Sequence, residues 1–175
     1  MSKGNTRLTA WVAKASVYDA LTLAVQMERG AVRAYTALAK SAPDRVTRAK
    51  FRYLAEEERE HLRMASVTRR AFPKPCESTP PPASLSEADG VAEQKNAAAA
   101  VRHAIRGEQK AQDFYRACAA RCRKPTARKM FERFAAQEAR HAMILKEELA
   151  LLAGGPGGSS LEGGVPIEED FWLQK

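Results

Sequence analysis

Residues 51–64, FRYLAEEEREHLRM, and residues 131–149, FERFAAQEARHAMILKEEL, decide the fold of this chain. In both stretches the apolar residues recur at the three- and four-residue spacing of an amphipathic helix. A Glu-x-x-His motif lies within each apolar stripe, as Glu58 with His61 and as Glu138 with His141. The two motifs are 80 residues apart, which indicates that a helical unit is duplicated.

A further glutamate stands 30 residues before each motif, at Glu28 and Glu108, again within an apolar stripe. Tyr35 and Tyr115 follow these glutamates by seven residues and repeat at the same interval of 80. None of the segments alternates as a strand does, so the predicted fold class is all-α. The expected helices cover residues 16–40, 44–71, 87–121 and 125–152.

The two halves, 16–71 and 87–152, are joined by a 15-residue linker at 72–86 that contains five prolines. Proline disfavours helix and favours an extended chain. Such a linker reaches roughly 45–50 Å, whereas a 28-residue helix is about 42 Å long. It can therefore cross the bundle, making the second and third helices parallel, or carry the second half to another subunit in a domain-swapped dimer. The sequence leaves both arrangements open.

The segments outside the predicted bundle of residues 16–152 differ from it in composition. Residues 1–15 form an N-terminal extension that is basic, weakly resembles an organellar presequence and lacks a signal-peptide core. We expect an uncleaved, cytoplasmic protein. Residues 153–175 form a flexible, Gly-rich tail with a short C-terminal segment. That segment, residues 161–175, either docks on its own bundle, stays mobile, or binds a partner protein or shell through Phe171 and Trp172.

The composition limits the function classes. Charged residues make up 29% and hydrophobic residues 45% of the 175 residues, as in a globular domain. No apolar run approaches the ~18 residues of a membrane span, so no membrane partner is expected. The net charge is +8, but the basic residues are spread through the helices rather than clustered with aromatics. We therefore do not expect nucleic acid as a partner.

The three cysteines do not form a secreted disulfide framework. Cys76 lies in the Pro-rich linker, and Cys118 and Cys122 are four residues apart on a predicted helix. We expect reduced thiols, of which the two on the helix are packed near its end. A redox relay between Cys118 and Cys122 is the alternative.

The position of the glutamates on apolar stripes predicts a metal site. A buried, unpaired carboxylate is costly, and four of them close together also repel one another. Two divalent cations would balance their charge. Residues i and i+3 of a helix point the same way, so each Glu-x-x-His pair can hold one metal ion. The predicted ligands are Glu28, Glu58, His61, Glu108, Glu138 and His141.

Neighbouring charged residues fall off the stripes and are assigned to the solvated surface. They are Glu56, Glu57, Glu60 and His103. The two tyrosines are different, because each lies two turns, about 10 Å, from the glutamate on its own helix. If the first and third helices are antiparallel, Tyr35 comes near Glu108 and Tyr115 near Glu28. Each tyrosine then either donates a hydrogen bond to a metal ligand or is an ordinary core residue.

The four helices together resemble the rubrerythrin branch of the ferritin-like superfamily. The matching stretches are ALTLAVQMERGAVRAYTALAK (20–40), AIRGEQKAQDFYRACAA (104–120) and the two stretches quoted first. This resemblance implies a ferritin-like antiparallel four-helix bundle with a long crossover between its second and third helices. It also implies two iron ions held by the six predicted ligands. Manganese or zinc are possible substitutes, since carboxylate and imidazole ligands suit all three metals.

The function implied by the resemblance is that of a di-iron carboxylate oxidoreductase. Reduced iron would react with hydrogen peroxide or dioxygen, in an oxidative-stress or iron-redox role, with electrons from an external donor. The expected catalytic residues are Glu58 and Glu138, as bridging carboxylates, with Tyr35 and Tyr115. A homodimer is expected. The alternatives are a ferroxidase or iron-handling protein, a di-iron hydroxylase with an external reductase, and a structural bundle whose metal only satisfies buried charge.

Two departures from the family pattern affect the reaction more than the site. Peroxide-reducing rubrerythrins carry an extra glutamate one turn past the ligand of the third helix. This chain has Ala111 there, and Ala31 at the symmetry-related position. Those proteins also commonly carry a rubredoxin module, and no CxxC pair for a rubredoxin-type iron occurs in these 175 residues.

Overall fold

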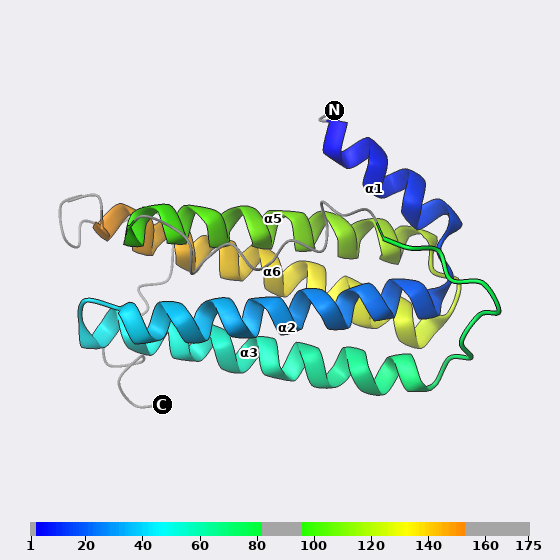
Figure 1. Ribbon diagram of the computed structural model, residues 1–175, viewed down its shortest axis with the longest axis horizontal. Coiled ribbons are helices and arrows are strands. Elements are labelled where there is room, and N and C mark those ends of the chain that lie inside the picture. The colour runs from blue at the N-terminus through cyan, green and yellow to red at the C-terminus, as the bar shows by residue number, and fades with distance from the viewer. Residues whose placement is uncertain (1–2, 82–95, 153–175) are drawn as a thin grey trace.

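The computed structural model describes residues 3–81 and 96–152 and is all-helical over them (Figure 1). The predicted all-α class is therefore confirmed. The helices are α1 (Lys3–Lys14), α2 (Val17–Ser41), α3 (Arg45–Arg70), α5 (Ala97–Arg121) and α6 (Pro125–Leu152). None of these helices combines the length and apolar character that crossing a membrane requires.

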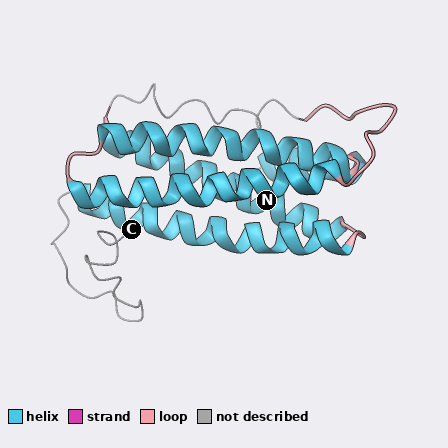
Figure 2. Cartoon of the chain, turned by 90° about the horizontal axis from the view of Figure 1, so that it is seen from below, coloured by secondary structure: helices cyan, strands magenta, loops and turns pink. Residues whose placement is uncertain are grey.

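The bundle consists of two antiparallel helix pairs, α2 with α3 and α5 with α6 (Figure 1). The view from below shows the four long helices side by side along one axis (Figure 2). Helix α3 ends at one end of the bundle and α5 begins at the other, so these two helices run parallel (Figure 1). This is the first of the two arrangements that the length of the linker left open. Residues 82–95 of the connection lie outside the described part, and the domain-swapped assembly stays a prediction.

Side-chain caps explain where the helices begin. Ser16 and Asp19 form a capping box on α2, in which the Ser16 Oγ accepts from the Asp19 N–H at 3.0 Å and the Asp19 carboxylate accepts from the Ser16 N–H at 3.3 Å. Asp44 caps α3 by accepting from the Thr47 N–H at 2.8 Å, and Asn96 caps α5. The third helix was expected from residue 87, but α5 begins at Ala97, and residues 87–95 are not among those described.

Helix α1 lies in the segment 1–15, for which the sequence predicts no helix. Leu8, Trp11 and Val12 are buried in the same core cluster as residues of α2, α5 and α6. The Trp11 indole N–H donates to the carbonyl of Thr79 at 3.2 Å, and the Thr79 N–H donates to Asp19 at 3.4 Å. The N-terminal segment and the start of the crossover therefore close one end of the bundle.

Two apolar clusters fill the interior, and every long helix contributes to both. The first cluster, at the α1 end, is aromatic and includes Phe114, Phe131 and Phe134. The second is mainly aliphatic and includes Leu54 and Leu145. Along each long helix the predicted metal ligands fall between residues of one cluster and residues of the other. The two clusters therefore shield the middle of the bundle from water on both sides.

Candidate metal centre

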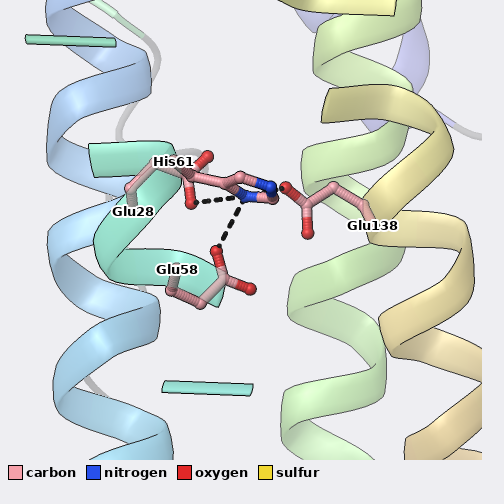
Figure 3. Close-up of side chains that lie close together, drawn as sticks. All are labelled: Glu28, Glu58, His61 and Glu138. Atoms are coloured by element: carbon pink, nitrogen blue, oxygen red, sulfur yellow. Dashed lines mark hydrogen bonds and ion pairs between the residues drawn. The ribbon is translucent and has the colours of Figure 1, made fainter. Parts of the chain in front are cut away.

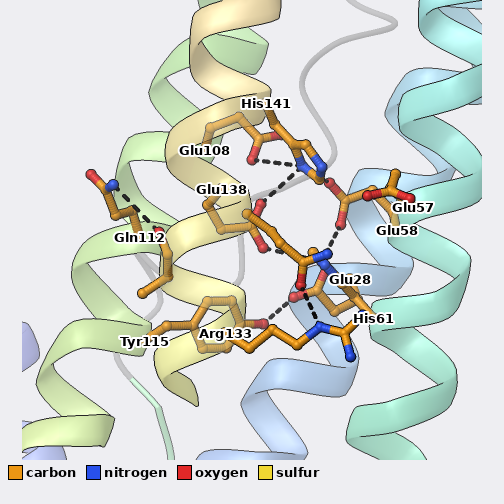
Figure 4. A network of polar contacts seen from close by, with 12 residues as sticks. Glu28, Glu57, Glu58, His61, Glu108, Gln112, Tyr115, Arg133, Glu138 and His141 are labelled. Carbon is orange, nitrogen blue, oxygen red and sulfur yellow. Dashed lines mark hydrogen bonds and ion pairs between the residues drawn. The ribbon is translucent and has the colours of Figure 1, made fainter. Parts of the chain in front are cut away.

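Six titratable side chains from all four long helices converge in the middle of the bundle (Figures 3 and 4). None of them is more than 5% exposed. The structure brings together all six residues that the sequence predicts as ligands. They are Glu28 of α2, Glu58 and His61 of α3, Glu108 of α5, and Glu138 and His141 of α6.

The six residues form two overlapping groups. One group has Glu28, Glu58, His61 and Glu138, and the other has Glu58, Glu108, Glu138 and His141; in each, the candidate ligand atoms lie within 4.8 Å of one another. Glu58 and Glu138 belong to both groups, which suits carboxylates that bridge two ions. The two groups are related by the same interval of 80 residues that repeats in the sequence.

The histidine of each group faces three carboxylates through its Nδ1 atom. His61 Nδ1 lies 3.1 Å from Glu58, 3.3 Å from Glu138 and 3.6 Å from Glu28 (Figure 3). His141 Nδ1 lies 2.8 Å from Glu58, 3.2 Å from Glu138 and 3.8 Å from Glu108. Ligands held about 2.0–2.2 Å from one ion lie at similar separations from each other.

Packing fixes the orientation of the imidazoles. The His61 ring stacks on Phe134 with 4.3 Å between centroids and lies 5.6 Å from the His141 ring. Each histidine is three residues after its glutamate, so both side chains leave the same helix face. The Glu-x-x-His spacing and the aromatic cluster thus direct both rings toward the carboxylates.

Several polar atoms of the cluster have no hydrogen-bond partner. Such atoms are rare in protein interiors and call for an explanation. His141 Nδ1 is the clearest case, because it lies 2.8 Å from Glu58 Oε1, an ion-pair distance, without the geometry of a hydrogen bond. Imidazole nitrogens and carboxylate oxygens held this close together are suited to share a metal ion. The atoms are Glu58 Oε1, His61 Nε2, Glu138 Oε1, His141 Nδ1 and His141 Nε2.

The four carboxyl groups of the cluster fall into two classes by the direction in which their surroundings shift the pKa. Burial raises the pKa of Glu28 and Glu108 well above the usual range, and the nearby charges of Glu58 and Glu138 add to this. Burial alone would also raise the pKa of Glu58, but the His141 and His61 imidazoles lower it below its usual range. The same two imidazoles lower the pKa of Glu138, against burial and the Glu58 charge.

The facing carboxylates raise the pKa of both imidazoles. Burial would lower the pKa of His61, but the Glu138, Glu28 and Glu58 carboxylates raise it to about 12. The pKa of His141 is raised in the same way by its three carboxylates. When no metal is bound, the directions of these shifts favour protons on Glu28, Glu108 and both imidazoles, and negative charge on Glu58 and Glu138. Two divalent ions would balance the charge of four carboxylates beside two neutral imidazoles.

Each tyrosine donates a hydrogen bond to the glutamate of the opposite half. The Tyr35 hydroxyl donates to Glu108 and the Tyr115 hydroxyl donates to Glu28. This confirms the predicted pairing and the antiparallel relation of α2 and α5. Burial and the neighbouring carboxylates raise the pKa of both tyrosines well above its usual value, so each stays a proton donor.

The residues assigned to the surface lie outside the cluster. Glu56, Glu57 and Glu60 pair with arginines at 2.7, 3.0 and 2.6 Å respectively. His103 is half-buried, and burial together with the charges of Arg106 and Lys110 lowers its pKa. Surface ion pairs of this kind contribute little to stability.

The two positions that carry alanine in place of an added glutamate are half-buried. Ala111 packs against the aromatic cluster and Ala31 against the aliphatic one. Neither position offers a ligand atom. Cys76, Cys118 and Cys122 are free, and burial raises the pKa of Cys118, which keeps it a thiol and makes it a poor nucleophile.

One buried acid was missed by the sequence reasoning. Glu148 is 1% exposed and accepts from the Thr47 hydroxyl at 2.6 Å and from Lys50 at 3.0 Å. The sequence feature that could have identified Glu148 as buried is its position on the apolar face of α6, three residues after Leu145. Both carboxylate oxygens of Glu148 have a partner on α3, so Glu148 ties α6 to α3 and does not join the metal cluster.

Comparison with known proteins gave one match. The family model described as Rubrerythrin matches residues 19–79 and 100–161. The two ranges cover most of the chain, correspond to its two halves, and include all six cluster residues and both tyrosines. No curated protein and no solved structure matched.

Proposed function

Because this chain belongs to the rubrerythrin family, we propose that it is a di-iron oxidoreductase in which reduced iron reacts with hydrogen peroxide or dioxygen. The family is one of di-iron carboxylate proteins, and the buried cluster fits a two-metal site. The observation that carries the proposal is the convergence of four carboxylates and two imidazoles, in two overlapping groups, in the buried centre of the bundle.

In this proposal the six residues divide between two ions. Glu28 and His61 would hold one ion, Glu108 and His141 would hold the other, and Glu58 and Glu138, which belong to both groups, would be shared between them. Two iron ions bound here would supply Lewis acidity and one redox equivalent each. The metal could also be manganese or zinc, since the ligand set accepts all three.

The protein's own groups orient the ligands and control protons. The Tyr35 and Tyr115 hydroxyls fix the outer carboxylates, Glu108 and Glu28, by donating a hydrogen bond to each. The apolar clusters on either side keep water out, which strengthens every charge interaction inside. Electrons for repeated turnover would come from an external donor, in the cytoplasm.

A ferroxidase or iron-handling function is the second candidate, and Ala111 is the observation that favours it. Peroxide-reducing members of the family have an additional glutamate at this place, whereas here a methyl group packs against the aromatic cluster. A site limited to six ligands fits oxidation of successive Fe(II) ions as well as it fits a catalytic cycle with a resident iron pair.

The test loads the metal-free protein with Fe(II) without oxygen and mixes it with peroxide or with dioxygen in a stopped-flow instrument. We expect faster iron oxidation than for free Fe(II). Glu58→Gln should lose more rate than the roughly 10–100-fold typical of changes around a metal ligand. Glu56→Gln is the matched control, because this exposed residue lies on the same helix, outside the cluster, and pairs with the exposed Arg59. Equal rates for bound and free iron would exclude the proposal, and sustained oxidation of repeated Fe(II) additions would favour the ferroxidase.

A further inference from the structure

Aromatic side chains form a continuous chain from α1 to the metal cluster. The Trp11 ring lies 6.4 Å from the Phe114 ring, and the Phe114 ring lies 5.0 Å from the Tyr115 ring, centroid to centroid. The Tyr115 hydroxyl donates to Glu28, one of the cluster carboxylates (Figure 4). A single aromatic ring therefore separates the indole of Trp11 from a tyrosine that touches the cluster.

The two ends of this chain of rings lie at different depths. Tyr115 and Phe114 are fully buried, while Trp11 retains 7% exposure on the outermost helix of the fold. Its neighbours Ala10, Ala13 and Lys14 are exposed. The indole is held in place by its hydrogen bond to the carbonyl of Thr79. Trp11 thus lies at the outer end of the chain of rings, next to exposed residues of α1.

Tryptophan and tyrosine are the side chains most readily oxidised by one electron, and electron tunnelling slows steeply with distance. We propose that Trp11 and Tyr115, with Phe114 between them, form a one-electron relay that connects the surface at α1 to the metal cluster. The proposal deepens the proposed function and rests on it, because it assigns the route by which an external one-electron donor reaches the oxidised cluster.

The transfer balances without any further reactant. Tyr115 gives one electron to the oxidised cluster and its phenolic proton to the Glu28 carboxylate, leaving a neutral tyrosyl radical. Trp11 then gives one electron to that radical while the proton returns from Glu28, leaving a tryptophan radical cation. The external donor, a one-electron reductant, restores Trp11. One electron has moved from donor to cluster, and no proton is gained or lost.

Within residues 3–81 and 96–152, the chain of rings from Trp11 reaches the metal cluster on the Tyr115 side. Tyr35, the counterpart of Tyr115, lies in the second cluster, whose other buried members are aliphatic apart from Phe51, with the half-buried Tyr53 packed against it. Helix α1 packs at the opposite end, on the Tyr115 side. Tyr35 and Tyr115 make equivalent hydrogen bonds to the cluster, so Tyr35→Phe is a matched control for the change of Tyr115.

The first test needs no iron. In a Trp172→Phe background Trp11 is the only tryptophan. Zinc-loaded full-length protein is flashed with a soluble ruthenium photo-oxidant, and transient absorption follows tryptophan and tyrosine radicals. We expect the Trp11 radical to decay as a tyrosyl radical appears, which is the relay's exchange of one electron between the two side chains, run in the opposite direction. Tyr115→Phe, which keeps the ring, should abolish that coupled rise, and Tyr35→Phe should leave it intact. A rise that survives in Tyr115→Phe, or none in the parent protein, overturns the relay.

The second test uses iron-loaded, reduced protein and excess peroxide with no external donor. Peptide mass spectrometry then measures oxidation of Trp11. We expect oxidised Trp11 in the parent protein and its loss in Tyr115→Phe, per iron oxidised. Equal oxidation in both proteins would mean that peroxide reaches Trp11 directly, which contradicts the relay. If the iron does not react at all, the proposed function fails, while the flash experiment still decides whether the rings are coupled.

Discussion

Binding of two divalent ions to the metal-free protein should release four protons. At pH 7 we expect Glu28 and Glu108 to hold protons, because burial and the Glu58 and Glu138 charges raise their pKa. We expect both imidazoles to be protonated, because the facing carboxylates raise the pKa of His61 to about 12 and raise that of His141 as well. All four groups must lose a proton to bind metal. Glu58 and Glu138 contribute none, because their lowered pKa values leave them ionised.

The proton count sets the pH dependence of metal affinity. Two protons released per ion mean that affinity rises about hundredfold per pH unit for each ion, while the four groups stay protonated in the metal-free state. The sign is fixed: lower pH weakens binding. Titration calorimetry with Zn(II) is repeated at pH 7 in buffers of different ionisation enthalpy. The slope of the observed binding enthalpy plotted against the ionisation enthalpy of the buffer gives the number of protons released.

Matched variants locate the protons. Glu28→Gln should lower the count by about one. Glu56→Gln should leave it unchanged, since Glu56 is exposed, lies outside the cluster and pairs with the exposed Arg59. A slope near zero for the parent protein would refute the charge distribution described here, because the ligands would then already be in their metal-binding protonation states.

The remaining predictions concern stability. In the metal-free fold, His61 and His141 hold protons that the unfolded chain loses above about pH 6.5, and Glu28 and Glu108 hold protons that it loses above about pH 4.3. The free energy of unfolding should therefore fall as pH rises from about 6.5, by up to about 1.4 kcal/mol per unit for each of the four groups that still holds its proton in the fold. Urea unfolding at pH 6.5–9 checks this, and constant or rising stability would contradict it. Glu148→Gln should cost about 1–3 kcal/mol in the same assay by weakening the bonds to Thr47 and Lys50, without changing the number of ions bound. Its exposed neighbour Glu147→Gln should stay within about 0.5 kcal/mol, and equal effects would remove the role given to Glu148. Trp11→Ala should cost about 3–5 kcal/mol by emptying a core position, whereas the exposed Arg7→Ala should be nearly neutral; a neutral Trp11→Ala would mean that α1 does not belong to the fold.

The periodic part of the chain could be predicted from the sequence. The four long helices follow from apolar spacing, and α6 has the predicted bounds of Pro125 and Leu152. The convergence of the six cluster residues follows from their repeat at 80 residues, because equivalent positions of a duplicated helix pair face one another. The bonds of Tyr35 and Tyr115 follow from the antiparallel run of two equal helices.

Features that depend on a single tertiary contact could not be predicted. Helix α1 has 12 residues, and such short helices are marginal without packing. Its burial depends on the contact of Trp11 with Phe114, more than 100 residues away. In the sequence, Glu148 is one of several acids near the end of α6, and only its contacts with Thr47 and Lys50 in the fold distinguish it. The aromatic chain from Trp11 to Tyr115 could not be predicted from the sequence, because it also depends on a tertiary contact.

Anomalous diffraction at the iron edge, on crystals of protein purified from its own host and assayed for metal content, tests the central claim most directly. Two iron peaks are predicted in the middle of the bundle, one among Glu28, Glu58, His61 and Glu138 and the other among Glu58, Glu108, Glu138 and His141. Crystals with no iron in this cluster, or with metal bound only elsewhere on the protein, would contradict it.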